Sequence, residues 1–378
     1  MMTLSRDPYG TGMACDVLSA YRRDLERTPD VVTFGPDDAR WLRAALRVER
    51  LVTQPIASRA SGLARISAHP LMRGAPLLAL TERMEAAGAL MLSFATLALA
   101  RRVWERNDFE SAAAAIFRQA RISRTTGATA AAENFYAYLF SYATRHRLPE
   151  MRGRALVGRG IIRTLEGNPV AGRRWFAEAR RASGNHPVAT AVSYHGDMNA
   201  ALALDDLSGA LVAGWRALET RALGRYDEAG VLVNLASLSL KAGRPDAALA
   251  TVRRAIRRSA HPRVRLGAFS KGAMAAAALG RAALVERFAT RLIGVAAHIN
   301  VPPDELEARS ELAEALALVG ERTRARRLAR SVRAEAQEHS LGTVIARCDR
   351  VLTTIPAAPA LLELSSPAQR VVAELAAA

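Results

Sequence analysis

A pair of apolar-periodic helices joined by a tight turn returns repeatedly along this chain. In residues 243–259 the apolar side chains recur with the 3.6-residue period of an α-helix, and the arginines lie on the opposite face. The preceding segment 229–243 has the same period, so the two segments predict a helix hairpin that turns at Gly243. The same kind of hairpin is found at 155–182, 193–219, 267–293 and 311–336.

The second helix of nearly every hairpin has a small residue near its start, where two helix backbones cross closely. The equivalent positions are Gly172, Ala210, Ala248, Val285 and Ala325, separated by 38, 38, 37 and 40 residues. One hairpin cannot bury its apolar faces alone, so this repeat predicts a stack of hairpins, an α-solenoid. The low aromatic content, 5%, and the many alanines also favour an all-α fold.

The motifs GRPDAAL, GNPVAG and GDMNAALALDDLSGAL resemble the glycine-turn-then-alanine pattern of tetratricopeptide repeats (TPRs). The spacing exceeds the usual 34 residues and is similar to that of the longer repeats in MalT-type bacterial regulators. The resemblance covers about residues 80–350. It implies an all-α α-solenoid, a right-handed superhelix of about 5–7 TPR-like hairpins, in which first helices line a groove and second helices form the outer wall.

The pattern divides the chain into four predicted parts. These are a poorly ordered segment, 1–34, a helix with an irregular linker, 35–80, the solenoid, 81–350, and a linker with a C-terminal helix, 351–378. Before the hairpin at 155–182 one helix is left over, which predicts a break or an extra helix at 128–150.

The extra helix gathers aromatic residues on more than one face. A helix that is apolar on several sides is usually buried on them, so we expect a core helix at a junction of the solenoid. The alternative is a surface for a partner or a dimer, because Tyr and Phe are enriched at the cores of interfaces. The residues of this candidate aromatic interface are Phe135, Tyr136, Tyr138, Phe140 and Tyr142.

The chain has a net charge of +17 that is unevenly distributed. Residues 101–181 and 250–350 each have a net charge of +9, whereas residues 182–249 have a net charge of −2. Many of the arginines fall on second helices, so we interpret them first as the solvated face of the outer wall. Clustered arginines also leave open a phosphate-binding surface or attraction to anionic lipid.

No catalytic motif stands out in the sequence. Neither lysine lies in a P-loop context, and HExxH and GxSxG patterns are absent, so we predict a non-enzyme without a cofactor. Cys15 and Cys348 lie far apart with no histidine at ligand spacing, which predicts no metal site and suits a reducing compartment. The longest apolar run, 88–100, is too short to span a bilayer, and no secretory signal is visible. We therefore expect a cytoplasmic protein without a membrane partner.

The first helices are expected to supply the contacts to a partner. Candidate partner-binding residues on the groove side are Arg154, His195, Asn199, Asn234, Ser237, Ser270, Lys271 and Glu314. The two-lysine carboxylate clamp of the TPR family is not matched, because only one lysine is among these residues. The predicted function is a non-catalytic scaffold that binds a protein or peptide in its groove, within a bacterial regulatory or signalling system. The alternatives are a nucleic-acid-binding protein that uses arginine-rich helix faces, and a ligand-sensing module of a transcription regulator.

The segment 361–375 predicts a short amphipathic helix, capped by Ser366 and opened by Pro367. It is similar to the first helix of LuxR-type DNA-binding domains. Because no recognition helix follows it in this sequence, we expect instead a helix that closes the end of the solenoid, or a loose tail.

Overall fold

The structure is a computed structural model that describes residues 77–79, 81–82, 85, 90–297, 302–354 and 356–377. The predicted segment 1–34 and nearly all of the predicted linker 35–80 lie outside the described residues. Contacts divide the chain into two compact units. The N-terminal unit runs to Ile162 and includes Arg181–Gly184, and the C-terminal unit comprises Arg163–Arg180 and the chain from Asn185 onward.

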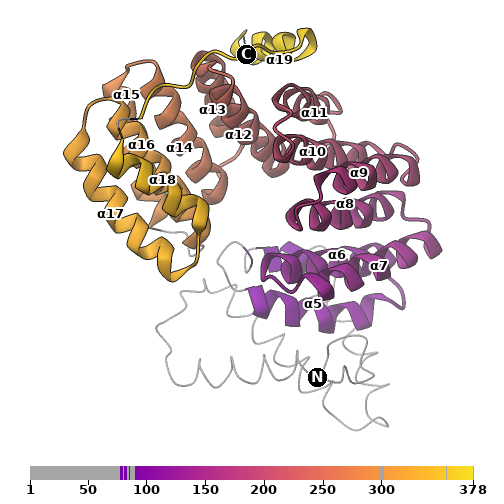
Figure 1. Cartoon of the computed structure of the whole chain (residues 1–378). Helices are drawn as coiled ribbons and strands as arrows, with labels where there is room; N and C mark the ends of the chain where they lie inside the picture. The colour runs from indigo at the N-terminus through magenta and orange to yellow at the C-terminus, as the bar shows by residue number, and fades with distance from the viewer. Residues whose placement is uncertain are drawn as a thin grey trace, which may run out of the picture. The chain divides into compact units, whose positions relative to one another are not determined.

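The N-terminal unit is built from helices that follow one another through tight turns (Figure 1). They are α5 (Leu90–Trp104), α6 (Phe109–Thr125), α7 (Thr129–Arg145) and α8 (Pro149–Leu165), whose last residues belong to the C-terminal unit. Helix α6 packs on both α5 and α7. It begins after Asp108, whose carboxylate accepts a hydrogen bond from the backbone N–H of Ser111 at 3.1 Å. Trp104 and Ile116 are buried between these helices and anchor the core of the unit.

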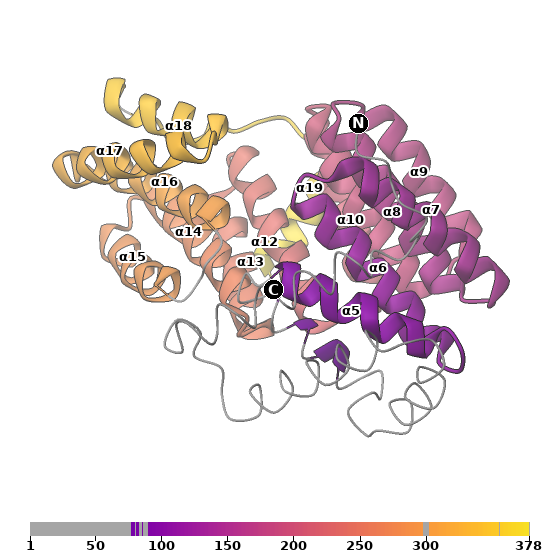
Figure 2. The same cartoon turned by 90° about the horizontal axis from the view of Figure 1, so that it is seen from below.

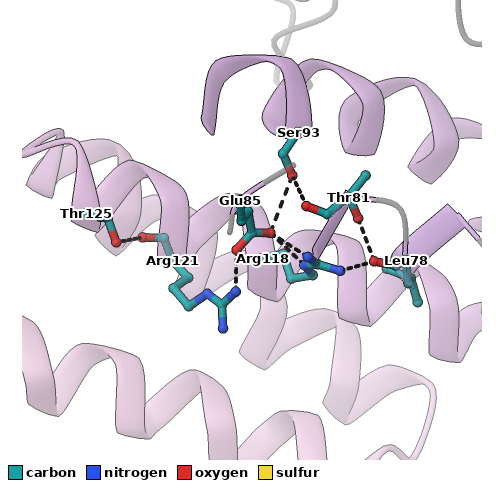
Figure 3. A network of polar contacts seen from close by, with 7 residues as sticks. All are labelled: Leu78, Thr81, Glu85, Ser93, Arg118, Arg121 and Thr125. Atoms are coloured by element: carbon teal, nitrogen blue, oxygen red, sulfur yellow. Dashed lines mark hydrogen bonds and ion pairs between the residues drawn. The ribbon is translucent and has the colours of Figure 1, made fainter. Parts of the chain in front are cut away.

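A largely buried carboxylate joins the start of the described chain to α6 (Figure 3). Glu85 accepts a hydrogen bond from Nε of Arg118 at 2.7 Å and forms an ion pair with Arg121. Arg118 also donates to the carbonyl oxygen of Leu78, and Ser93 of α5 donates to the carbonyl of Thr81 at 3.2 Å. The contacts of Glu85 lie within one unit and satisfy one another, so we regard this network as structural.

The C-terminal unit contains most of the helix hairpins. Its helices are α9 (Pro169–Ala182), α10 (Pro187–Ala203), α11 (Leu207–Glu219), α12 (Arg225–Lys241), α13 (Pro245–Arg258), α14 (Pro262–Ala278), α15 (Ala282–Ala296), α16 (Pro302–Leu318), α17 (Arg322–Glu338), α18 (Gly342–Thr353) and α19 (Ser366–Ala377). The pairs α10–α11, α12–α13, α14–α15 and α16–α17 form extensive antiparallel hairpins. We call α10, α12, α14, α16 and α18 the first helices, and α11, α13, α15 and α17 the second helices.

The predicted crossing residues explain why these helices pack closely. All of them are buried, namely Gly172, Ala210, Ala248, Val285 and Ala325. Within the described residues all regular structure is α-helical, and successive helices pack on one another from α5 to α7 and from α10 to α18. The prediction of an all-α solenoid of TPR-like hairpins is therefore confirmed.

The C-terminal helix α19 lies neither at the end of the stack nor free, in contrast to our expectation. It packs on α11 and α13, two second helices that precede it by more than 100 residues (Figure 1). On the way, the backbone N–H of Leu362 donates to the carbonyl of Ala242 at 3.2 Å. The apolar side of α19 joins the core of the unit through Ala368, Val371 and Leu375. The amphipathic pattern predicts the helix correctly, but the apolar surface that it covers was not foreseen.

The turn between α12 and α13 requires glycine for two separate reasons. Gly243 has a φ of 70°, in the left-handed region that residues with a Cβ rarely adopt. A Cβ at this position would also lie 2.3 Å from the carbonyl oxygen of Ala360, in the returning C-terminal segment. The turn and the path of the C-terminal segment are therefore coupled.

Candidate partner-binding site

The first helices of the C-terminal unit lie side by side, and we call the surface that they share the first-helix wall. Helix α12 packs on α14, α14 on α16, and α16 on α18 (Figure 2). Residues one repeat apart therefore meet on adjacent helices: His195 and Asn234 are 39 residues apart, and Lys271 and Glu311 are 40 apart. Seven of the predicted residues belong to this wall: His195, Asn199, Asn234, Ser237, Ser270, Lys271 and Glu314.

A buried carboxylate organises the C-terminal part of the wall. Glu311 of α16 has a side chain that is only 6% exposed, and it forms an ion pair with Lys271 of α14. Its other oxygen, Oε2, accepts a hydrogen bond from Oγ of Ser270 at 2.8 Å. Two of the predicted residues therefore do not point freely to solvent, because they bind Glu311.

Arginine 347 approaches the same carboxylate from α18. Its Nη1 lies 3.5 Å from Oε1 of Glu311, and its Nε lies 3.6 Å from Oε2 of Glu314. Its Nη1 also donates a hydrogen bond to Oγ of Ser310 at 3.0 Å. Glu311 is thus held between one cation of α14 and one of α18, and Glu314 pairs with the cation of α18. We call Ser270, Lys271, Glu311, Glu314 and Arg347 the Glu311 cluster.

The charges of the Glu311 cluster are balanced. Burial by itself would raise the pKa of Glu311, but the Lys271 ammonium and the Arg347 guanidinium, with hydrogen bonds from Lys271 and Ser270, hold that pKa below its usual value. The carboxylate is therefore ionised at neutral pH and does not act as a proton donor there. Its role is structural, because its ion pairs and hydrogen bonds hold α14, α16 and α18 together.

A second polar group lies on α10 and α12, and we call it the α10–α12 patch. The side-chain amide nitrogen of Asn234 lies 3.1 Å from Nε2 of His195. The amide N–H donates to Nε2 in the His195 tautomer whose ring proton lies on Nδ1. Asn199 follows His195 by one helical turn and is exposed, and Ser237 follows Asn234 by one turn and is half-buried. Within the described chain, neither side chain of this second pair has a hydrogen-bond partner.

Histidine 195 is a neutral member of this patch. Burial lowers the pKa of His195, and the nearby Asp227 carboxylate opposes that effect only in part. Near neutral pH the ring is therefore uncharged. The α10–α12 patch thus offers neutral donors and acceptors, whereas the Glu311 cluster offers charges that are already paired.

Arginine 154, also a predicted partner-binding residue, belongs to the N-terminal unit. It is on α8 within the N-terminal unit, where its Nε donates to Glu150 at 2.8 Å. Its guanidinium carbon lies 5.3 Å from the centre of the Phe117 ring. Both contacts occupy the side chain locally, so its role in partner binding stays a prediction.

The aromatic residues of α7 lie mainly in the interior of the N-terminal unit. Tyr136 and Tyr142 are buried, and Phe135 and Phe140 are partly buried against the same core. Tyr138 is 38% exposed, and its hydroxyl donates to the carboxylate of Glu105 at 3.1 Å. The predicted aromatic interface stays a prediction, and Tyr138 is its most accessible residue.

Several arginines of the second helices are neutralised by neighbouring acids. Nε of Arg258 on α13 donates to Glu228 of α12 at 2.6 Å, and Nη2 of Arg254 lies 3.9 Å from the same carboxylate. Arg324 of α17 binds Glu286 of α15 with both terminal nitrogens. These pairs are partly or largely exposed, so they contribute little to stability and serve mainly as a solvated surface.

Two members of the Glu311 cluster, Glu311 and Arg347, are not among the residues predicted from the sequence. Both could have been found by adding one repeat length to Lys271 and then another, since such steps reach neighbouring first helices. A single charged residue on a helix gives no sign, by itself, of a partner about 40 residues away, so neither residue was predicted.

The fold and the site define an all-α, TPR-like helical-repeat protein with a polar first-helix wall. No protein-family model matches the sequence, and no curated protein matches it. Among solved structures the chain is similar to the "Crystal Structure of Rap Protein Complexed with Competence and Sporulation Factor". The sequence identity is 14%, the TM-score is 0.48, and the similarity covers 96% of this chain and 94% of that one. The fold class given above rests on the hairpins of this chain.

The described residues carry few other chemical features. None of their helices combines the length and the apolar content that a membrane span requires. The same residues contain no group of three or more His, Cys, Asp or Glu side chains that could hold a metal ion. Cys348 is buried on α18, where burial raises the pKa of its thiol, and Cys15 lies outside the described residues.

Proposed function

We propose that this chain is a non-catalytic scaffold that binds a protein or peptide along its first-helix wall, within a bacterial regulatory or signalling system. The observation that carries the proposal is the α10–α12 patch, in which Asn199 and Ser237 carry polar groups with no bond among the described residues. The regulatory setting rests on the resemblance of the repeats to those of MalT-type regulators.

The geometry of adjacent helices suits an extended peptide. Packed helices lie about 8–10 Å apart, and an extended chain advances about 3.3 Å per residue. Every third residue of a peptide that crosses the wall would therefore meet the next first helix. The amides of Asn199 and Asn234 can each donate and accept, which is what the alternating N–H and C=O groups of a peptide backbone require. The Glu311 cluster keeps α14, α16 and α18 in place beside this patch.

The test is a capture experiment with the whole chain as bait, performed with and without nuclease. We expect nuclease-resistant recovery of a protein partner, and the double variant Asn199→Ala, Ser237→Ala should bind the isolated partner about tenfold more weakly, since two hydrogen bonds are lost. Gln337→Ala, an exposed amide on α17, is the matched control and should leave the affinity unchanged.

Two outcomes would contradict the proposal. Recovery of only RNA or DNA, abolished by nuclease, would assign the chain to the nucleic-acid class. A partner whose affinity is equal for the wild type and the double variant would place the binding surface elsewhere.

A further inference from the structure

A hollow on the opposite side of the hairpins from the first-helix wall lies between the second helices α13 and α15. It has a volume of about 280 Å³, and its apolar lining comes from Ile256, Leu284 and Phe288. Apolar cavities of about 150 Å³ already hold a molecule as large as benzene, so this hollow has room for apolar side chains. It belongs entirely to the C-terminal unit.

Four arginines surround this apolar lining. Arg253 and Arg257 are one turn apart on α13, and Arg287 and Arg291 are one turn apart on α15. All four side chains are exposed, and none of them has an acidic partner among the residues that the structure describes. Together with the apolar lining we call this feature the arginine groove.

On α13 the groove arginines differ from the other two arginines in their lack of an acidic partner within the described residues. On α13, Arg254 and Arg258 share the carboxylate of Glu228, whereas Arg253 and Arg257 have no such neighbour in the described chain. Pairs one turn apart present their guanidinium groups side by side. Two such pairs on facing helices therefore create a concentrated positive field over an apolar lining, and this field attracts carboxylates.

In this chain an amphipathic helix packs on two successive second helices. Helix α19 packs on α11 and α13, and it contributes Val371 and Leu375 to the apolar core there. Helix α13 thus has a second helix on each side of it, α11 and α15. The α11–α13 side is covered by an amphipathic helix, and the α13–α15 side carries the arginine groove.

We propose that the arginine groove is a docking site for an acidic amphipathic helix of a partner protein. Apolar residues on one face of that helix would enter the hollow over Ile256 and Leu284. Glutamates or aspartates flanking the apolar face would pair with the arginines of α13 and α15. The site lies on other helices than the first-helix wall, so it does not rest on the function proposed for that wall.

An acidic helix fits the groove better than a nucleic acid does. A phosphate backbone would pair with the arginines but would leave the apolar lining uncovered. Single strands bind proteins by stacking their bases on exposed aromatic rings, and the one aromatic residue of the groove, Phe288, is only 5% exposed. An acidic amphipathic helix matches both parts of the site, since its carboxylates pair with the arginines and its apolar face covers the apolar lining.

The probe is a synthetic acidic helix of about 18 residues, with leucines at positions i, i+4 and i+7 and glutamates on both sides of them. Binding to the full chain is measured by fluorescence anisotropy at about 150 mM salt. We expect the double variant Arg257→Glu, Arg287→Glu to weaken binding at least about tenfold. The matched control Arg326→Glu, Arg330→Glu reverses two exposed charges on α17 and should change the affinity by less than about twofold.

A second peptide, in which glutamine replaces each leucine, tests the apolar half of the site and should bind at least about fivefold more weakly. Equal binding of both peptides would overturn the proposal, because the arginines would then bind the peptide by charge alone, without a contribution from the apolar lining. Equal binding by the wild type and the groove variant would overturn it as well. So would a single-stranded oligonucleotide whose binding is lost in the groove variant while peptide binding is kept. Circular dichroism of each variant verifies that the helices are intact.

Discussion

Replacing Glu311 by glutamine is expected to lower the free energy of unfolding by about 3 kcal/mol. The substitution keeps an acceptor for Ser270 but removes the negative charge that neutralises Lys271, whose side chain is only 14% exposed. A buried cation without its counter-charge costs far more than the pair itself contributes. The measurement is urea unfolding of the full chain followed by circular dichroism.

A matched double variant separates the charge from the packing. Lys271→Met combined with Glu311→Leu removes both members of the ion pair and should recover most of the lost stability. If the double variant is as unstable as Glu311→Gln, the cost comes from the shape of the site and the charge argument fails.

The effect of Glu311→Gln should also depend on pH. Because the folded state holds the pKa of Glu311 below its unfolded value, the unfolded chain takes up the proton first as the pH falls. The stabilisation is therefore complete above the unfolded pKa of about 4.3 and is lost as the pH falls through the folded pKa. The difference between wild type and variant should be full at pH 7 and shrink toward strong acid. A constant difference would contradict the assignment.

Replacing Gly196 by alanine is expected to destabilise the chain by about 2 kcal/mol, although alanine is the better helix former. A Cβ at this position of α10 would lie 2.5 Å from Cε1 and 2.8 Å from Cζ of Phe176 on α9. Phe176 is only 1% exposed, so its ring is enclosed by neighbouring groups that would have to shift with it. The helices must separate, and the crossing loses contacts along its length.

A glycine of another first helix provides the control for this prediction. Gly230 of α12 is also within a first helix, but no atom lies within 4 Å of a Cβ placed there. Gly230→Ala should therefore leave stability unchanged or raise it by up to about 1 kcal/mol. The second substitution Phe176→Leu should partly rescue Gly196→Ala by shortening the ring. Equal effects of Gly196→Ala and Gly230→Ala on the urea midpoint would refute the steric account.

Much of the fold could be predicted from the sequence, because helix periodicity and turn chemistry are local properties. The crossing residue near the start of each second helix is buried as expected, and so is the apolar stripe of α13 from Ala248 to Ala255. The first helices also have small residues where a neighbouring helix packs closely, but these residues are glycines that were not predicted. Gly196 and Gly272 lie two repeats apart, and each receives a phenylalanine ring from a neighbouring second helix or α9.

The site could be predicted only in part, because its contacts link residues about 40 positions apart. The sequence places Ser270, Lys271 and Glu314 on first helices, but the repeat length varies between 37 and 40 residues. That variation is close to one helical turn, so it leaves open which residue of α16 meets Lys271. The packing partners of α19 could not be predicted either. An amphipathic pattern shows that one face of a helix is buried, but it does not show which helices bury it.

The return of the C-terminal segment changes how this repeat protein should come apart. In a linear array each repeat touches only its neighbours, so the terminal ones can melt while the rest persists. Here the bond from Leu362 to Ala242 and the one from Ser365 to Ser208 close a long loop that contains every hairpin after α13. The last hairpins are consequently tethered at both ends, and their loss becomes a cooperative event shared with the centre of the unit.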